Sequence, residues 1–243
     1  IGTLRACYAS AVAACEAVTR VMTQALIPRA LEFMDASALR AVGAAGAARD
    51  VPAATQALLI VEVDGAYAEI ERQLGLLTLA LDGPGAVEIR QAHNAAETQA
   101  LWAARRALSA AVKAIAPHKI NEDIVVPVTR LASMLSYIEA LAERYRLPIV
   151  SFGHAGNGNL HVNIMVHRDD ADEMQRAETC LEALLREVLR LGGTLSGEHG
   201  IGSEKRRFVE WEIAPATLDM MRAIKRQFDP RGILNPDKIF PPQ

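Results

Sequence analysis

Two kinds of apolar period alternate along this chain, and their order constrains its fold more than any other feature. Short apolar runs with the length of strands are separated by segments in which apolar residues recur with the period of a helix. In the first part, the predicted strands are 3–8, 27–34, 56–63 and 86–91, and the predicted helices are 11–22 and 67–79. Asn94 is expected to cap a further helix towards Ala114, whereas 37–52, rich in Ala and Gly, is expected to be a loop or a weak helix. The first part thus has the order β-α-β-β-α-β.

The second part repeats this order. The predicted strands are 123–128, 148–152, 159–167 and a last one that starts at 194–196, and the predicted helices are one capped by Thr129 and one over 171–191. Two such units predict an α+β fold with two successive ferredoxin-like halves that share an antiparallel sheet. The halves would be 1–120 and 121–200, followed by a tail, 201–243, with helices over 203–212 and 215–228.

Composition excludes several classes of protein. The net charge of -3 gives no electrostatic reason to bind nucleic acid, and no apolar run is long enough to cross a bilayer. The three cysteines are scattered, which is typical of buried free thiols in a reducing compartment. We therefore expect a cytoplasmic protein, with peripheral attachment to a membrane as an alternative, and a homodimer as one option for its assembly. Because the chain begins with Ile1 and no Met, we expect it to be a piece of a longer protein.

Two glycine-rich stretches, 153–163 and 196–202, carry three of the six histidines. If 155–158 form the loop of a hairpin, strand alternation places four polar side chains on one face: His154, Asn159, His161 and Asn163. The simplest interpretation is a polar turn that faces water. The presence of Glu198 and His199 in the second stretch favours a metal site instead, because two imidazoles and one carboxylate can hold a divalent ion with open positions.

The roles of these residues follow from their chemistry. His154, His161 and Glu198 are the candidate metal ligands, and they suit zinc, with manganese or iron as alternatives. His199 is the candidate general base, because its pKa range suits proton transfer. Asn163 could donate a hydrogen bond to a substrate carboxylate or carbonyl. Lys205, beside Arg206 and Arg207, is predicted to lie on a solvated helix face.

Three motifs together resemble a known family, the C-terminal domain of FAD-linked oxidases of the vanillyl-alcohol oxidase type. They are Gly153 to Asn163, Ser196 to Gly202 with Lys205, and Asp229 to Lys238. Within the family, the chain is similar to the glycolate oxidase D subunit, D-lactate dehydrogenase and D-2-hydroxyglutarate dehydrogenase branch. The resemblance covers essentially all of 1–243, most clearly from Leu101 onward.

The resemblance implies further roles. His154, His161 and Glu198 match the metal ligands of the family, and His199 matches its catalytic base. Substrate contacts are implied for Arg105, Ser109, Lys119 and Asn163. Contacts with the FAD cofactor are implied for Gly197, Gly200 and Asn235. In the family, a flavin-binding domain precedes this one, so the chain is expected to lack it.

The implied function is that of the substrate- and metal-binding half of a flavin-dependent 2-hydroxy-acid dehydrogenase. The substrate would be of the D-lactate, glycolate or D-2-hydroxyglutarate type, and hydride would pass from its C2 atom to FAD. The expected partners are this small acid, the missing FAD-binding domain, and an electron acceptor protein or quinone. Alone, the chain is expected to bind no FAD tightly and to be inactive. Two alternatives stay open: a self-sufficient metal-dependent hydrolase, and a non-catalytic metal-binding ferredoxin-like module.

Overall fold

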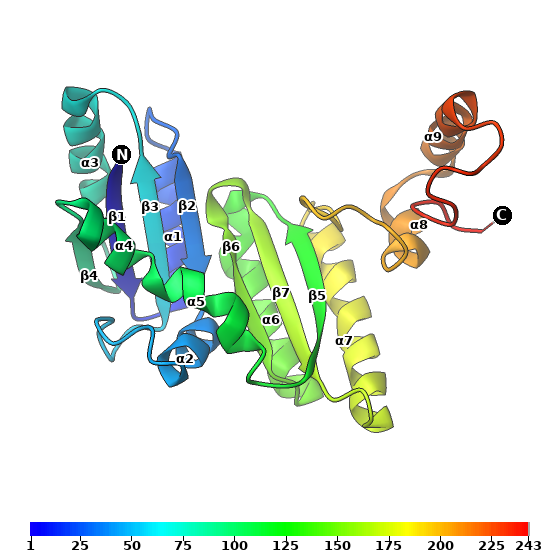
Figure 1. The fold of residues 1–243 in the computed structure, drawn as a ribbon, viewed down its shortest axis with the longest axis horizontal. Coiled ribbons are helices and arrows are strands. Elements are labelled where there is room, and N and C mark those ends of the chain that lie inside the picture. The colour runs from blue at the N-terminus through cyan, green and yellow to red at the C-terminus, as the bar shows by residue number, and fades with distance from the viewer. Residues whose placement is uncertain (243) are drawn as a thin grey trace.

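A seven-stranded antiparallel sheet forms the centre of the computed structural model, which describes residues 1–242 (Figure 1). Its strands lie in the order β4-β1-β3-β2-β6-β7-β5. Their bounds are β1 Gly2–Tyr8, β2 Ala30–Met34, β3 Ala57–Val63, β4 Ala86–Gln91, β5 His118–Val125, β6 Ile149–His154 and β7 Asn159–Val166. The predicted α+β class is confirmed, with both units contributing to one sheet.

The two units join through their second strands. In the first unit the strand order is β4-β1-β3-β2, which is the ferredoxin-like arrangement. The second unit continues the sheet with the order reversed: its second strand comes first, then its third and its first, as β6-β7-β5. Strands β2 and β6 pair antiparallel, with Glu32 opposite His154 and Phe33 opposite Gly153. This pairing brings residues from the two units to the same place on the sheet.

Helices cover the two faces of the sheet unequally. Four helices pack on one face across both units: α1 Ala11–Met22, α3 Tyr67–Leu81, α6 Leu131–Tyr145 and α7 Ala171–Arg190. The opposite face is covered by α2 Ala36–Ala44, α4 Ala95–Leu101 and α5 Ala103–Val112, which lie over the first unit and the junction. The second unit therefore leaves much of this opposite face free for a polar site.

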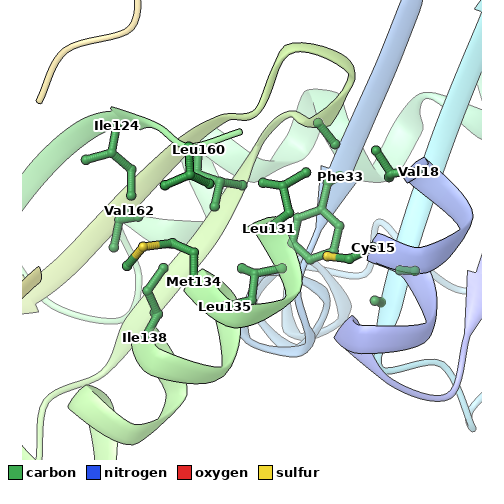
Figure 2. Packing of buried hydrophobic residues seen from close by; sticks show 14 of the residues in the cluster. Cys15, Val18, Phe33, Ile124, Leu131, Met134, Leu135, Ile138, Leu160 and Val162 are labelled. Atoms are coloured by element: carbon green, nitrogen blue, oxygen red, sulfur yellow. The ribbon is translucent and has the colours of Figure 1, made fainter. Parts of the chain in front are cut away.

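Local sequence signals set the start of several helices. A side-chain oxygen of the N-cap residue accepts the N–H three residues later at Ser10, Asp35, Asn94 and Asp170. The helices then bury their apolar stripes in one core that continues across the junction. Figure 2 shows Phe33 of β2 between Cys15 of α1 and Leu131 of α6. The two units thus share one hydrophobic core.

The last predicted strand of the second unit does not form. Thr194 makes a single antiparallel bridge with Val125 of β5, and no strand continues from it in the described residues. The cause is a contact with a residue distant in the sequence: residues 197–199 donate their backbone N–H groups to the side chain of Asp123. The prediction of a strand starting at 194–196 was wrong because this carboxylate replaces a strand partner.

Several element bounds also differ from the prediction. Of the two options for segment 37–52, a helix forms in its first part, as α2 starts at Ala36 and ends at Ala44, whereas the helix after Asn94 breaks at Trp102 into α4 and α5. Thr129 is not an N-cap, because it lies inside a 3-10 turn, Val128–Arg130, that leads into α6. Strand β5 starts at His118, five residues before the predicted start at Asp123, which brings Lys119 into the sheet.

The tail beyond the sheet is only partly helical. Segment 203–212 forms a 3-10 turn, Arg206–Phe208, and a short helix, α8 Val209–Glu212, before α9 Pro215–Phe228. Figure 1 shows α8 and α9 beyond the β5 edge of the sheet. Within residues 1–242, no helix combines the length and the apolar character that a bilayer span needs.

Candidate functional site

The free face of the second unit carries a cluster of polar side chains. Alternation along β7 places His161 and Asn163 on this face, while Leu160, Val162 and Ile164 lie in the core on the other side. Strand β5 adds residues in register, since Asp123 lies opposite His161 and Asn121 opposite Asn163. The predicted hairpin face therefore extends over a third strand.

Asp123 folds the second glycine-rich stretch over the end of this face. Its Oδ2 atom accepts the backbone N–H groups of Gly197, Glu198 and His199 at 2.8, 2.7 and 2.8 Å. Its Oδ1 atom accepts Nδ2 of Asn159 at 2.6 Å. Burial alone would raise the pKa of Asp123, but these hydrogen bonds from His199, Asn159 and Glu198 together hold it well below its usual range. The carboxylate therefore stays ionised and fixes the loop.

Lys205 completes the support of this loop from the edge of the sheet. Its Nζ atom donates to the backbone oxygens of Asp123 at 2.9 Å and Leu195 at 2.5 Å, and it lies 3.1 Å from Oε2 of Glu122. Only 5% of Lys205 is exposed. The prediction of a solvated helix face was wrong for Lys205, because an ammonium that satisfies two carbonyls and a carboxylate can be buried.

The side chain of Glu198 lies close to both of the other candidate metal ligands. Oε1 of Glu198 lies 3.5 Å from Nε2 of His154 and 3.3 Å from Nε2 of His161. Donor atoms held at about 2.0–2.2 Å from a tetrahedral zinc ion are roughly 3.3–3.6 Å apart. Burial and the neighbouring His154 lower the pKa of His161, so its imidazole is neutral at neutral pH, the form that binds metals. The residues present therefore fit a divalent ion.

Each of the two imidazoles has a carboxylate behind it. Nδ1 of His154 donates to Oε1 of Glu32, a residue of β2 in the other unit. Nδ1 of His161 is buried without a hydrogen-bond partner and lies 4.0 Å from Oδ1 of Asp123. In both residues the Nε2 atom is the one that faces Glu198, which is the arrangement that metal-bound histidines favour.

A second grouping of donors overlaps the first. Asp123, His161, Glu198 and His199 each offer one atom within 4.8 Å of the others. Among these residues Asp123 is the weaker candidate ligand, because its oxygens already accept five hydrogen bonds from the loop and Asn159. We therefore retain His154, His161 and Glu198 as the candidate ligands.

His199 stands at the exposed side of this cluster. Its ring stacks on that of His161, with the centroids 5.3 Å apart and an interplanar angle of 15°. Its backbone is fixed by Asp123, while its side chain is exposed. A histidine held in this way can exchange a proton with a molecule bound beside the cluster.

Arg105 of α5 is linked to the site through Glu32, which also contacts His154. Its Nε atom donates to Oε2 of Glu32 at 2.8 Å, and its guanidinium lies over the ring of Phe152, 5.0 Å from the centroid. Because this bond uses Nε, it leaves the two Nη atoms to bind another group. They form an edge of the guanidinium that suits a carboxylate. Ser109, one turn further along α5, is exposed, and no described hydrogen bond links it to the cluster.

Lys119 and Asn163 contact each other. Nζ of Lys119 donates to Oδ1 of Asn163 at 2.9 Å, and Nδ2 of Asn163 donates to the backbone oxygen of Val150 at 3.3 Å. Burial, with a smaller effect of Lys113, lowers the pKa of Lys119. Asn163 is thus buried and occupied by internal partners, whereas Lys119 is the cation on this part of the face.

The three residues expected to contact the cofactor lie in two segments, the loop with Gly197 and Gly200 and the tail with Asn235. A Cβ atom at Gly197 would lie 2.1 Å from Nδ2 of Asn159, so a close approach within the chain already requires glycine there. Gly200 is exposed and has a φ of +80°. Asn235 lies in the tail, which contacts the stretch around Gly202 through the backbone N–H of Ile239.

A cavity of about 470 Å³ adjoins the cluster at the junction of the two units. Glu32, His154 and Asn157 line its polar side. Its other wall is mainly apolar and consists of Met22, Ile27, Pro28, Ala30 and Leu31, with Arg29 beside them. The cavity therefore offers a space next to a candidate metal ligand.

Sequence reasoning missed Glu32 and Asp123, which organise the site. Glu32 lies in a predicted extended segment, where a charged residue among Leu31, Phe33 and Met34 was the available signal. Asp123 lies in the buried end of β5, which starts at Glu122, and is fully buried itself. A buried carboxylate without a basic neighbour in the sequence indicates a structural or functional partner elsewhere in the chain.

Comparison with known proteins identifies the family. The family model described as "FAD linked oxidases, C-terminal domain" matches residues 2–239. The chain belongs to this family. The resemblance of the three motifs is thus confirmed over nearly the whole chain.

Relatives of this FAD-linked oxidase domain include subunits of larger enzymes. Glycolate oxidase subunit GlcD of Bacillus subtilis (strain 168) is 35% identical over 238 residues, which are 98% of this chain and 50% of that protein. D-2-hydroxyglutarate dehydrogenase of Stutzerimonas stutzeri (strain A1501) is 38% identical over 148 residues, which are 59% of this chain and 32% of that protein. The chain spans about half the length of the first curated relatives it matches.

Solved structures share the fold of this domain. A structure of p-cresol methylhydroxylase with substrate bound has a TM-score of 0.74 at 13% identity, and the match covers 98% of this chain and 52% of that chain. A structure of 4-ethylphenol oxidase from Gulosibacter chungangensis has a TM-score of 0.71 at 15% identity, covering 99% and 54%. At this level of identity, the likeness concerns the fold alone.

Proposed function

We propose that this chain forms the substrate- and metal-binding part of a FAD-dependent dehydrogenase of 2-hydroxy acids. One observation carries the proposal: the Nε2 atoms of His154 and His161 lie within 3.5 Å of the same oxygen of Glu198, with His199 stacked beside them. The names of the relatives, a glycolate oxidase subunit and D-lactate and D-2-hydroxyglutarate dehydrogenases, support the substrate class.

In this proposal, His154, His161 and Glu198 hold a divalent ion, with zinc as the first candidate and manganese or iron as alternatives. The ion would lower the pKa of a hydroxyl bound to it, as it does for water. With three protein ligands, the ion would keep open coordination positions for a substrate.

Arg105 binds the substrate carboxylate through its Nη edge, because its Nε atom is held by Glu32. Lys119 adds a second cation and is itself held by Asn163. Ser109 is an exposed residue on the same helix as Arg105 and is the last of the proposed contacts. These groups fix the carboxylate end of the acid, so that its C2 hydroxyl lies towards the metal ligands.

His199 accepts the hydroxyl proton. Its exposed imidazole lies against His161, so it is beside the ion site without being one of the three candidate ligands. FAD, held mainly by another part of the whole protein, would supply the acceptor for the hydride from C2. Gly197, Gly200 and Asn235 are proposed to lie on the flavin side of the site. We also propose that a protein or a quinone accepts the electrons, and that the whole protein forms a homodimer.

The test is a substrate screen of the whole protein with a dye as electron acceptor, before and after removal of metal by a chelator. We expect oxidation of one of D-lactate, glycolate or D-2-hydroxyglutarate, loss of activity on chelation, and recovery with zinc, manganese or iron. Full activity in protein shown to be metal-free would contradict the metal role. Hydrolysis of an ester without FAD would instead support the hydrolase alternative.

Substitution of the base tests the role of His199. In His199→Gln we expect kcat to fall by roughly 10²–10⁴-fold, because proton transfer by a positioned side chain contributes that much. Metal content and KM should change little. His93→Gln is the matched control, since His93 is exposed and lies outside the cluster. An unchanged kcat in His199→Gln would assign the proton to another group.

A further inference from the structure

We infer that Glu32 is a positioning residue that holds the candidate metal ligand His154 and the candidate carboxylate-binding residue Arg105 with its two oxygens. This inference rests on the proposed function, because it assigns a role to Glu32 within that site. Glu32 belongs to β2 of the first unit, whereas His154 belongs to β6 of the second. The site would therefore depend on the pairing of the two units.

The geometry of Glu32 is that of a shared acceptor. It lies directly opposite His154 across the β2–β6 pair. Its Oε1 atom accepts Nδ1 of His154, and its Oε2 atom accepts Nε of Arg105 at 2.8 Å. Only 7% of its side chain is exposed, so the carboxylate itself is largely shielded from water. Both oxygens of this carboxylate are thus bound to residues of the proposed site.

The contact with His154 fixes the form of the imidazole. A carboxylate only accepts, so Nδ1 must carry the proton, and the lone pair is left on Nε2. It is Nε2 that lies 3.5 Å from Glu198. A carboxylate behind a metal-bound histidine fixes its tautomer and its ring orientation and raises its basicity as a ligand.

The contact with Arg105 fixes the direction of the guanidinium. The bond from Nε to Glu32 fixes which edge of the guanidinium points away from Glu32. The ring of Phe152 lies against the guanidinium and fixes the orientation of its plane. Glu32 also neutralises the charge of Arg105 close to the ion site. Without Glu32, the arginine would be a cation near a bound metal, and His154 would lose its acceptor.

Glu62 provides a matched control. It lies on the adjacent strand β3 and is also buried, at 9% exposed. Its Oε1 atom accepts Oγ1 of Thr3 at 3.1 Å and Nε1 of Trp102 at 2.8 Å. Neither partner belongs to the proposed site. A Glu→Gln change at this position therefore reproduces the loss of a buried charge without touching His154 or Arg105.

The experiment measures metal affinity in the whole protein, freed of metal by a chelator and titrated with Co²⁺ while the visible absorption of the ion is recorded. In Glu32→Gln we expect about 10- to 100-fold weaker Co²⁺ binding, which is typical when a partner of a ligating histidine is removed. The shape of the absorption bands should also change, and KM for the 2-hydroxy acid should rise. Glu32→Asp, which keeps the charge, should recover part of the affinity, and Glu62→Gln should match the unmodified protein.

The outcomes separate this inference from the proposed function. If the unmodified protein binds no Co²⁺, the proposed metal site itself is wrong. If it binds Co²⁺ and Glu32→Gln binds it equally well, the role of Glu32 is overturned. Should Glu32→Gln fail to fold, long-range ¹H–¹⁵N spectra of the unmodified, metal-free protein decide. They must show the proton of His154 on Nδ1, and a proton on Nε2 would contradict the inference.

Discussion

Arg105 shows how one side chain can be prepared for a ligand by its neighbours. Its Nε atom and its planar face are occupied by Glu32 and Phe152, and the Nη edge is the part that is left. The rotational freedom of the long side chain is thus already restricted before any substrate binds. Less entropy is then lost when a carboxylate arrives.

Replacement of Arg105 by Lys keeps the charge but removes the two-sided geometry, because an ammonium is a point charge without a planar fork. We expect KM for the 2-hydroxy acid to rise by about 10- to 100-fold, the loss of one charged hydrogen bond, with a smaller change in kcat. Steady-state kinetics of the whole protein measure both. Arg106→Lys, at the exposed neighbouring position whose side chain reaches the backbone of Gln99, is the control and should leave KM unchanged. Equal effects in the two variants would rule out a specific contact for Arg105.

Among the elements, the loop 196–199 depends most on one residue. Three of its backbone N–H groups donate to Oδ2 of Asp123, and Glu198 and His199 are carried by this loop. A carboxylate that accepts several backbone N–H groups makes strong bonds, because the acceptor is charged and buried. The placement of the candidate ligand Glu198 and of the candidate base His199 thus derives from β5.

In Asp123→Asn, an NH₂ group replaces one of the two carboxylate oxygens. This hydrogen-bond donor then faces an N–H group that is itself a donor. We expect the free energy of unfolding to fall by roughly 2–4 kcal/mol and metal affinity to fall with it, since the loop loses its charged acceptor. Urea unfolding followed by circular dichroism measures the stability. Asn121→Ala, an exposed position two residues earlier on the same strand, should change it by less than about 0.5 kcal/mol. Similar losses in both variants would contradict the special role of Asp123.

The same residue predicts a dependence on pH. Its pKa is lowered in the folded state, so below the ordinary range of an aspartate the unfolded chain binds more protons than the folded one. The contribution of Asp123 is therefore complete above about pH 4–5 and is lost as the pH falls below it. Unfolding free energies between pH 3 and pH 7 should decline more steeply in acid for the unmodified protein than for Asp123→Asn. Parallel curves would show that Asp123 does not carry this effect.

The carboxylates of Glu32 and Asp123 also show which part of the site could not be predicted from the sequence. His154, His161 and Asn163 lie within one hairpin, so strand alternation alone placed them on a common face. Glu32 and Asp123 reach the site from distant strands, and their partners depend on which strands pair and in which register. Alternation does not contain that information. The predicted fourth strand of the second unit does not form for the same reason, because the carboxylate of Asp123, distant in the sequence, accepts the N–H groups of this segment.

On the scale of the whole molecule, Phe33 connects the two units. It is 1% exposed and packs between helices of both halves (Figure 2). In Phe33→Ala we expect a loss of about 3–5 kcal/mol with a single unfolding transition, because both halves share this core. Calorimetry measures the enthalpy and the number of transitions. Tyr67→Ala, at a position that is 80% exposed, is the control. Two separate transitions, with only one shifted, would show that the halves unfold independently.

The pairing of β2 with β6 also has a consequence for the synthesis of the chain. Glu32 and His154 are separated by 122 positions, so β2 leaves the ribosome long before its partner exists. At about 5–20 residues per second, this edge stays open for on the order of ten seconds. During that time an apolar strand, with Leu31, Phe33 and Met34 beside one carboxylate, offers free backbone groups to any other strand. The buried Glu32 is then the one charge within that strand that opposes association with a neighbouring nascent chain.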